Sequence, residues 1–213
     1  MSRMIPEVVC SGAASERLVR ALAPFGLVAR RGESPPRADA RAVGEILAMR
    51  PGEVALVTGP SGCGKSTLLR GAASAAAGQG VVQAERLPAR RAGGGAIIDL
   101  FTGSVARSRR VLSLAGLGEA GLWGRSPAEL SEGQRARLGL ALAMARAEQR
   151  RASLVLIDEF CSSLDRVTVR GVARAVRAWS RAAASARIVC ATSHDDVAEW
   201  LRPDLTIRPG GGL

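Results

Sequence analysis

The chain has 213 residues, of which 47% are hydrophobic and 23% charged, so it can bury the core of an α/β domain and is not a disordered polymer. Its formal net charge of +11 favours acidic partners, namely nucleotides, nucleic acids or anionic membrane surfaces, although scattered arginines also suit a solvated surface. Aromatic residues make up only 3%, which argues against a base-stacking platform for single-stranded nucleic acid.

Apolar periodicity and turn residues predict alternating helices and strands. In chain order these are a helix over 15–24, a loop over 30–41, a strand over 54–58, a helix over 65–77, strands over 81–82 and 96–98, a helical segment over 104–122, a helix over 131–149, a strand over 154–157, a helix over 164–184, a strand over 188–191, a short helix over 195–201 and a strand over 205–207. This alternation predicts an α/β fold with a mostly parallel sheet and helices on both faces.

We expect a single domain over 1–213. Residues 1–50 form a helix-and-loop lead-in, residues 104–150 a small helical insertion, and residues 208–213 a flexible tail. No apolar run approaches the roughly 20 residues that cross a bilayer, and no secretory leader is visible, so we expect a soluble cytoplasmic protein.

The four cysteines are too widely spaced for a zinc site, and the chain has only one histidine to add to them. They are Cys10, Cys63, Cys161 and Cys190. We expect them to be free thiols in a reducing compartment.

A glycine-rich segment follows the predicted strand over 54–58 and matches G-x-x-x-x-G-K-[ST]. Its residues are Gly59, Pro60, Ser61, Gly62, Cys63, Gly64, Lys65, Ser66 and Thr67. Successive backbone amides of such a loop bind phosphate oxygens, assisted by the N-terminus of the next helix. Lys65, the only lysine in the chain, is expected to reach the β- and γ-phosphates, and the Ser66 hydroxyl to ligate Mg²⁺.

Two carboxylates, Asp158 and Glu159, follow the apolar strand over 154–157. Ligands of open parallel sheets gather at the carboxyl ends of the strands, so we expect both acids to lie near the phosphates. Asp158 can hold Mg²⁺ through water, and Glu159 can polarise the attacking water.

A third segment, Leu130-Ser131-Glu132-Gly133-Gln134-Arg135, begins the helix over 131–149. Ser131 is a favourable N-cap residue, so its hydroxyl and the first helical amides form a second candidate phosphate site.

This segment resembles the signature motif of ATP-binding cassette (ABC) ATPases, with Glu132 where glycine is more usual. The order of the glycine-rich phosphate-binding loop (the P-loop, residues 59–67), the signature, the Asp-Glu pair and the histidine is similar to that family over residues 54–194. The resemblance implies a head-to-tail homodimer, in which Ser131, Gly133 and Gln134 of one copy close on ATP held by the other. Ser163-Leu164-Asp165 looks like the family's D-loop at the dimer interface. His194, the only histidine, looks like its switch histidine, which donates a hydrogen bond to the γ-phosphate.

Two features depart from the family pattern. Gln79 and Gln83 follow the P-loop helix very soon for the family's Q-loop glutamine, so Asp99, after the predicted strand over 96–98, is the candidate for that position. No aromatic residue is obviously placed to stack on adenine: Phe25 is the only one before the P-loop, with Arg30 and Arg31 as candidate replacements.

We therefore expect a Mg-ATP-hydrolysing ABC ATPase with Lys65, Glu159 and His194 at the reacting phosphate. The compact region between P-loop and signature favours a soluble, non-transport enzyme, most similar to the ABC group associated with a predicted acetyltransferase domain, which would here be a separate partner. Two alternatives remain: the ATP-binding subunit of a transporter with a membrane permease, and an ATPase switch that clamps nucleic acid.

Overall fold

The computed structural model describes residues 7–10, 14–31, 38–85, 87, 95–182 and 185–209. The chain forms two compact units, Met1–Arg37 and Ala38–Leu213. The lead-in expected over 1–50 is therefore divided between the two units, because residues 38–50 belong to the larger one. Of the tail expected over 208–213, residues 210–213 lie outside the described part.

The smaller unit contains two parallel strands joined through a helix. Its elements are β1 (Glu7–Cys10), α1 (Glu16–Leu22), a 3-10 turn η1 (Ala23–Phe25) and β2 (Val28–Arg31). The predicted helix over 15–24 is confirmed as α1, which Ser15 caps by accepting from the Leu18 amide at 3.2 Å. The predicted loop over 30–41 is wrong at its ends, because residues 30–31 belong to β2 and a second helix begins at Ala40.

The larger unit carries a sheet of five parallel strands in the order β4-β5-β6-β3-β7. Its strands are β3 (Val54–Thr58), β4 (Val81–Gln83), β5 (Leu154–Ile157), β6 (Arg187–Thr192) and β7 (Leu205–Ile207). Its helices are α2 (Ala40–Ala48), α3 (Lys65–Ala75), α4 (Val105–Leu114), α5 (Ala120–Trp123), α6 (Glu132–Arg150), α7 (Arg166–Ala182) and α8 (Val197–Leu201), with 3-10 turns η2 (Ile97–Leu100) and η3 (Pro127–Glu129).

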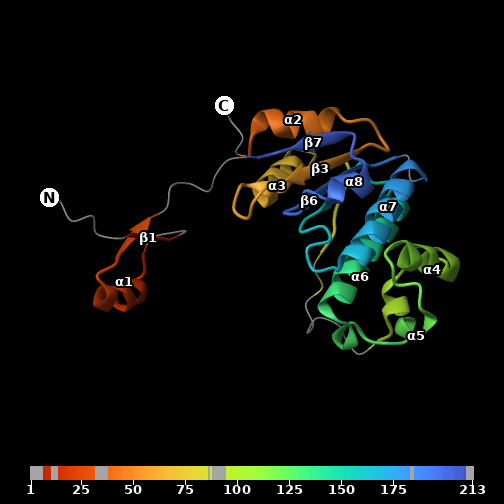
Figure 1. Ribbon diagram of the computed structural model, residues 1–213, viewed down its shortest axis with the longest axis horizontal. Coiled ribbons are helices and arrows are strands. Elements are labelled where there is room, and N and C mark those ends of the chain that lie inside the picture. The colour runs from red at the N-terminus through yellow and green to blue at the C-terminus, as the bar shows by residue number, and fades with distance from the viewer. Residues whose placement is uncertain are drawn as a thin grey trace. The chain divides into compact units, whose positions relative to one another are not determined.

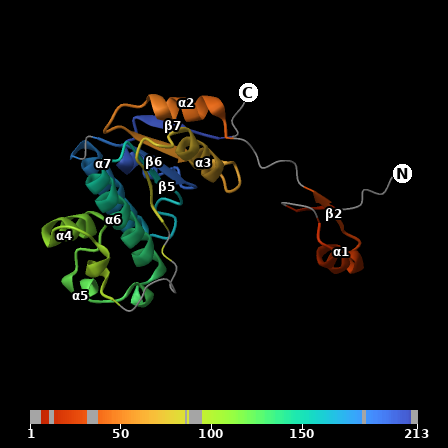
Figure 2. The same ribbon diagram turned by 180° about the vertical axis from the view of Figure 1, so that it is seen from behind.

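Alternate residues of the strands enter two separate cores, as a sheet covered on both faces requires. In β3, Val54 and Leu56 pack in one core, and Ala55 and Val57 pack in the other with residues of α2 and α3. The first core contains residues of α4, α6, α7 and α8. Figures 1 and 2 show α2 and α3 on one side of the strands and α6 and α7 on the other. The predicted parallel sheet with helices on both faces is confirmed.

The helical part between η2 and α6 packs on the first core through Val111 and Leu112 of α4, and one carboxylate adds polar contacts between them. Glu148 of α6 accepts a hydrogen bond from the Trp179 indole of α7 at 2.8 Å, and it pairs with Arg107 at 3.4 Å and with Arg110, both from α4. The Glu148 side chain is only 11% exposed, so these contacts compensate for its burial. The helical segment predicted over 104–122 consists of two helices, α4 and α5.

Candidate nucleotide site

The loop between β3 and α3 has the backbone conformation that its glycines allow. Gly62 and Gly64 have φ angles of 82° and 99°, in the left-handed region that other residues seldom adopt. The Lys65 ammonium folds back over this loop and donates to the carbonyl oxygens of Gly59 and Pro60, each at 2.7 Å. The predicted phosphate-binding residues 59–67 thus form one continuous loop and helix start at the carboxyl end of β3.

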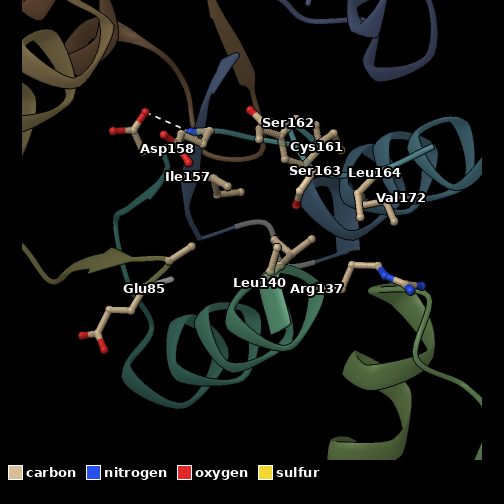
Figure 3. Close-up of a pocket in the computed structure, with 14 residues that line it drawn as sticks. Glu85, Arg137, Leu140, Ile157, Asp158, Cys161, Ser162, Ser163, Leu164 and Val172 are labelled. Atoms are coloured by element: carbon tan, nitrogen blue, oxygen red, sulfur yellow. Dashed lines mark hydrogen bonds between the residues drawn. The ribbon is translucent and has the colours of Figure 1, made fainter. Parts of the chain in front are cut away.

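Asp158 and Glu159 lie directly after β5, where the backbone turns sharply. The Glu159 amide donates to the Asp158 carboxylate at 2.9 Å (Figure 3). Glu159 itself has a φ of 50°, and the next amide, that of Phe160, donates to the Ala191 carbonyl of β6 at 2.7 Å. Because Phe160 is buried in the core, this turn holds the two carboxylates at the edge of the sheet.

His194 follows β6, whose last residue is Thr192. The His194 amide donates to the Thr192 hydroxyl at 3.2 Å, and the His194 ring is within 3.4 Å of the Arg166 guanidinium. The hydroxyl of Thr58, at the end of β3, donates to the Asp195 carboxylate. We call residues 192–196 the switch segment, after the resemblance of His194. This segment is therefore hydrogen-bonded to β3, the strand that leads into the phosphate-binding loop.

The sheet order brings these three segments together. Strand β6 lies between β3 and β5, with Thr58 paired to Thr192 and Ile157 paired to Cys190. Neighbouring strands are about 4.8 Å apart, so the three carboxyl ends span roughly 10 Å. The structure thus places the loop of Lys65, the carboxylates of Asp158 and Glu159, and His194 at one edge of the sheet.

Gln83 joins the same edge, which the sequence interpretation missed. It ends β4, and its register partner is Leu156 of β5, the strand that leads to Asp158. The strand predicted over 96–98 is wrong: Ile97–Leu100 is a 3-10 turn that contacts α4 and α5, and it carries Asp99 with it. The sequence signal for this placement was the short apolar pair Val81-Val82 of the predicted strand, which is followed directly by Gln83.

Ser131 caps α6 as expected. Its hydroxyl accepts from the Gln134 amide at 3.2 Å, and the Gln134 side chain accepts from the Ser131 amide at 2.9 Å, which completes a capping box. Gly133, two residues after Ser131, lies against Ser163 and Leu164 of the segment after β5. The signature and D-loop segments are therefore in direct contact within one chain.

A pocket of about 290 Å³ lies between α6 and the turn after β5 (Figure 3). Its walls include Leu140 of α6, Ile157 of β5 and Val172 of α7, and Asp158 and Glu159 also line it. The pocket thus separates the two carboxylates from the first turns of the signature helix.

Three side chains around the site, those of Asp165, Cys161 and Cys190, have shifted pKa values with clear causes. Hydrogen bonds from the Thr168 hydroxyl and amide lower the pKa of Asp165, which ends the D-loop segment. Burial raises the pKa of the Cys161 thiol to about 12 and that of Cys190 well above its ordinary value. Both thiols therefore stay protonated and unreactive, and Cys63, Cys161 and Cys190 are free, as expected.

Oxygen ligands for Mg²⁺ are present but few. The Ser66 hydroxyl and the Asp158 carboxylate are of the type that Mg²⁺ prefers, and no group of three or more metal-ligating side chains occurs among the described residues. This donor set fits an ion that binds together with nucleotide phosphates and takes only one or two ligands from the protein. Phe25, Arg30 and Arg31, the candidates for adenine stacking, belong to the smaller unit.

The sequence profile of the ABC transporter family matches residues 46–162. The chain belongs to the ABC transporter ATP-binding family. ATP hydrolysis is the characteristic activity of this family, which agrees with the predicted enzyme class.

Named relatives of this ABC chain are import proteins. It is 35% identical over 181 residues to an aliphatic sulfonates import ATP-binding protein of Ralstonia nicotianae, covering 74% of this chain and 61% of the relative. It is 31% identical over 210 residues to a taurine import ATP-binding protein of Chromobacterium violaceum, covering 85% and 76%. The chain thus spans about three fifths of the length of the sulfonate relative.

Solved structures confirm the cassette fold. The dimeric structure of MJ0796, a bacterial ABC transporter cassette, matches with a TM-score of 0.59 at 18% identity, covering 76% of this chain and 84% of that one. A post-hydrolysis dimer of the same cassette with ADP and Pi bound matches with a TM-score of 0.59 at 18% identity, covering 76% of this chain and 82% of that one. Among the described residues, no helix is both long and apolar enough to span a membrane.

Proposed function

We propose that this chain is the ATP-hydrolysing subunit of an ABC importer and works as a head-to-tail dimer coupled to a membrane permease. The observation that carries the chemistry is the convergence of Lys65, Asp158, Glu159 and His194 at one edge of the sheet. The names of the sulfonate and taurine import relatives support the transporter alternative over the soluble, non-transport interpretation. They give no support to an acetyltransferase or nucleic-acid partner.

Each group has a distinct task in this proposal. Lys65 exchanges its two carbonyl partners for the β- and γ-phosphates, and the amides of residues 59–64 bind the same oxygens. Ser66 and Asp158 would hold Mg²⁺, which neutralises phosphate charge when it binds with the nucleotide. Glu159 accepts a proton from the attacking water as the water oxygen bonds to the γ-phosphorus and the bond to the β–γ bridging oxygen breaks, which releases ADP. His194 donates a hydrogen bond to a γ-phosphate oxygen.

The second copy completes the site. Ser131 caps α6, a helix of 19 residues that packs against α4 on the opposite side of the sheet from α3 (Figures 1 and 2). The Ser131 hydroxyl, Gly133 and Gln134 of one copy would then close on phosphates held by the P-loop of the other. Gln83, at the end of the strand beside β5, takes the Q-loop position in place of Asp99.

A groove of about 550 Å³ on the helical part supports coupling to a permease. Leu100 and Phe101 line it on one side, and Arg146 and Arg150 of α6 on the other. Leu100 is 41% exposed, and Val105, nearby in the chain, is 64% exposed. An apolar strip beside arginines suits an amphipathic helical segment with acidic residues.

Substitution of Glu159 by glutamine tests the hydrolytic chemistry. The Glu159→Gln variant should bind ATP, lose at least about 100-fold in turnover because the base is absent, and accumulate as a dimer on size-exclusion chromatography. Lys65→Ala is the control, which should neither bind ATP nor dimerise. Normal hydrolysis by Glu159→Gln would show that the base is assigned wrongly.

The permease coupling is tested separately in vesicles that contain a candidate permease of the sulfonate or taurine importer type. Leu100→Asp should leave basal ATPase activity intact and abolish its stimulation by the permease, since it places a charge in the apolar part of the groove. Ala178→Asp makes a similar change at an exposed site on α7 and should have no effect. Equal stimulation of the two variants would contradict the assignment of this groove.

A further inference from the structure

Arg166 bridges the D-loop segment and the switch segment. It is the first residue of α7 and directly follows Asp165. One terminal nitrogen of its guanidinium lies 3.2 Å from the Asp196 carboxylate, and the other lies 3.4 Å from Nδ1 of His194. Asp165 accepts from the Thr168 amide at 3.0 Å, which holds the start of α7 in place. The backbone of Arg166 is therefore held at the start of α7, and its guanidinium is held by Asp196 and His194.

The chemistry of this contact determines where the histidine carries its proton. A guanidinium stays protonated in proteins and has five N–H donors but no acceptor. A hydrogen bond between Arg166 and Nδ1 of His194 thus requires Nδ1 to be the acceptor. A neutral imidazole with a lone pair on Nδ1 carries its single proton on Nε2.

We propose that Arg166 is a positioning residue that selects the Nε2–H tautomer of His194. This inference rests on the proposed role of His194 as a hydrogen-bond donor to the γ-phosphate. Only a neutral ring with its proton on Nε2 can accept from Arg166 and donate to a phosphate oxygen at the same time. Asp196 contributes by fixing the guanidinium, and the Thr192 hydroxyl by fixing the His194 backbone.

The tautomer can be observed directly, because His194 is the only histidine in the chain. The ring ¹⁵N chemical shifts of the uniformly labelled full chain are measured without nucleotide at alkaline pH, where imidazole is neutral. The wild type should show one protonated nitrogen, Nε2, and one unprotonated nitrogen, Nδ1. Arg166→Ala should move both shifts towards each other, as exchange between two tautomers requires.

Three further variants separate this role from a merely structural one. Arg170→Ala removes an exposed arginine one turn further along α7 and should leave both ring shifts unchanged. Arg166→Lys keeps a donor-only cation that can reach one of its two partners, so it should restore the wild-type shifts in part. Asp196→Asn, which leaves Arg166 intact, should produce a smaller shift change than Arg166→Ala.

Kinetics give the second readout. Arg166→Ala should lower kcat for ATP hydrolysis about tenfold while KM for ATP changes less than about twofold, because a donor that acts on the transition state is displaced. Ring shifts that Arg166→Ala does not change would overturn the inference and leave the role of His194 intact. A wild-type proton on Nδ1 would also overturn the inference, and hydrolysis by the His194→Ala variant decides the role of His194 separately. Undiminished hydrolysis by His194→Ala would instead overturn that role, whereas the spectra would still decide the tautomer.

Discussion

Gly133 of the signature segment lies against the backbone of Ser163 in the D-loop segment. A β-carbon on residue 133 would be 3.1 Å from the Ser163 carbonyl oxygen and 3.1 Å from a methyl group of Leu164. Both segments are expected at the dimer interface. Their direct contact within one chain means that a displacement of one is transmitted to the other.

Substitution of Gly133 by alanine should therefore impair hydrolysis through two segments at once. The added methyl group pushes the Ser163 carbonyl outward, and we expect ATP turnover to fall about tenfold or more. ATP binding to the isolated monomer should persist, since the P-loop is untouched. A nucleotide-binding titration and a phosphate-release assay measure the two effects. Gly171→Ala, at an open position of α7, is the control and should keep wild-type turnover.

Gly139→Ala should disturb the segment that carries Gln83. A β-carbon on residue 139 of α6 would overlap the backbone carbonyl of Glu85, two residues after Gln83. Overpacking against backbone typically costs about 1–3 kcal/mol, so the free energy of unfolding in urea should fall by that amount. Gly44→Ala, at an open and exposed position of α2, should instead gain up to about 1 kcal/mol from helix propensity. Equal stability of the two variants would show that α6 and the 83–85 segment are not in close contact.

From the hydrogen bonds of the Asp204 carboxylate we expect the protein to lose stability in acid. It accepts two hydrogen bonds from Arg177, at 2.5 and 2.8 Å, and one from the Val54 amide at 2.8 Å. Principally through the contact with Arg177, these bonds hold the pKa of Asp204 below its usual value. The carboxylate therefore stabilises the fold above the unfolded pKa of about 3.9, and this contribution is lost as the pH falls through the lower folded pKa.

Urea unfolding at pH 7 and at progressively lower pH measures that contribution. Asp204→Asn should be less stable than wild type by about 1–2 kcal/mol at pH 7, and the difference should shrink as the pH falls below about 4. A difference that is constant across this range would mean that the charge of Asp204 contributes nothing.

Thr58 connects the P-loop strand to the switch segment, and its loss should affect catalysis more than stability. Thr58→Val keeps the shape of a side chain that is 1% exposed but removes the donor to Asp195. We expect a loss of about 1 kcal/mol in stability and a clear fall in kcat, because Asp195 adjoins His194. The free energy of unfolding in urea and kcat for ATP hydrolysis are the two measurements. Thr206→Val on the neighbouring strand β7, where Thr206 is exposed, is the matched control for both.

Much of the sheet could be predicted because its strands are buried on both faces and therefore appear as continuous apolar runs. The predicted bounds of 54–58, 154–157 and 205–207 agree with the structure. Helix α2 was missed, although Asp39 caps it, since the preceding proline- and glycine-rich stretch indicated a loop. Ile97 and Ile98 were assigned to a strand because a short apolar pair does not distinguish strand from 3-10 turn.

The site could be predicted where its residues are contiguous in sequence, as in the loop of Lys65 and the pair Asp158-Glu159. Gln83 could not be placed, because its proximity to Asp158 depends on β4 pairing with β5, some 70 residues further along the chain. The contacts of Arg166 with His194 and Asp196 depend in the same way on the tertiary fold.

Because Lys65 is the only lysine, the phosphate-binding loop can also be labelled selectively by amine chemistry. Besides the α-amino group, Lys65 supplies the chain's only primary amine, and its nitrogen is held by two loop carbonyls. An acylating reagent that discriminates between amines and guanidinium groups has a single side-chain target. Protection of that target by a bound triphosphate would give nucleotide occupancy as a mass difference at one peptide.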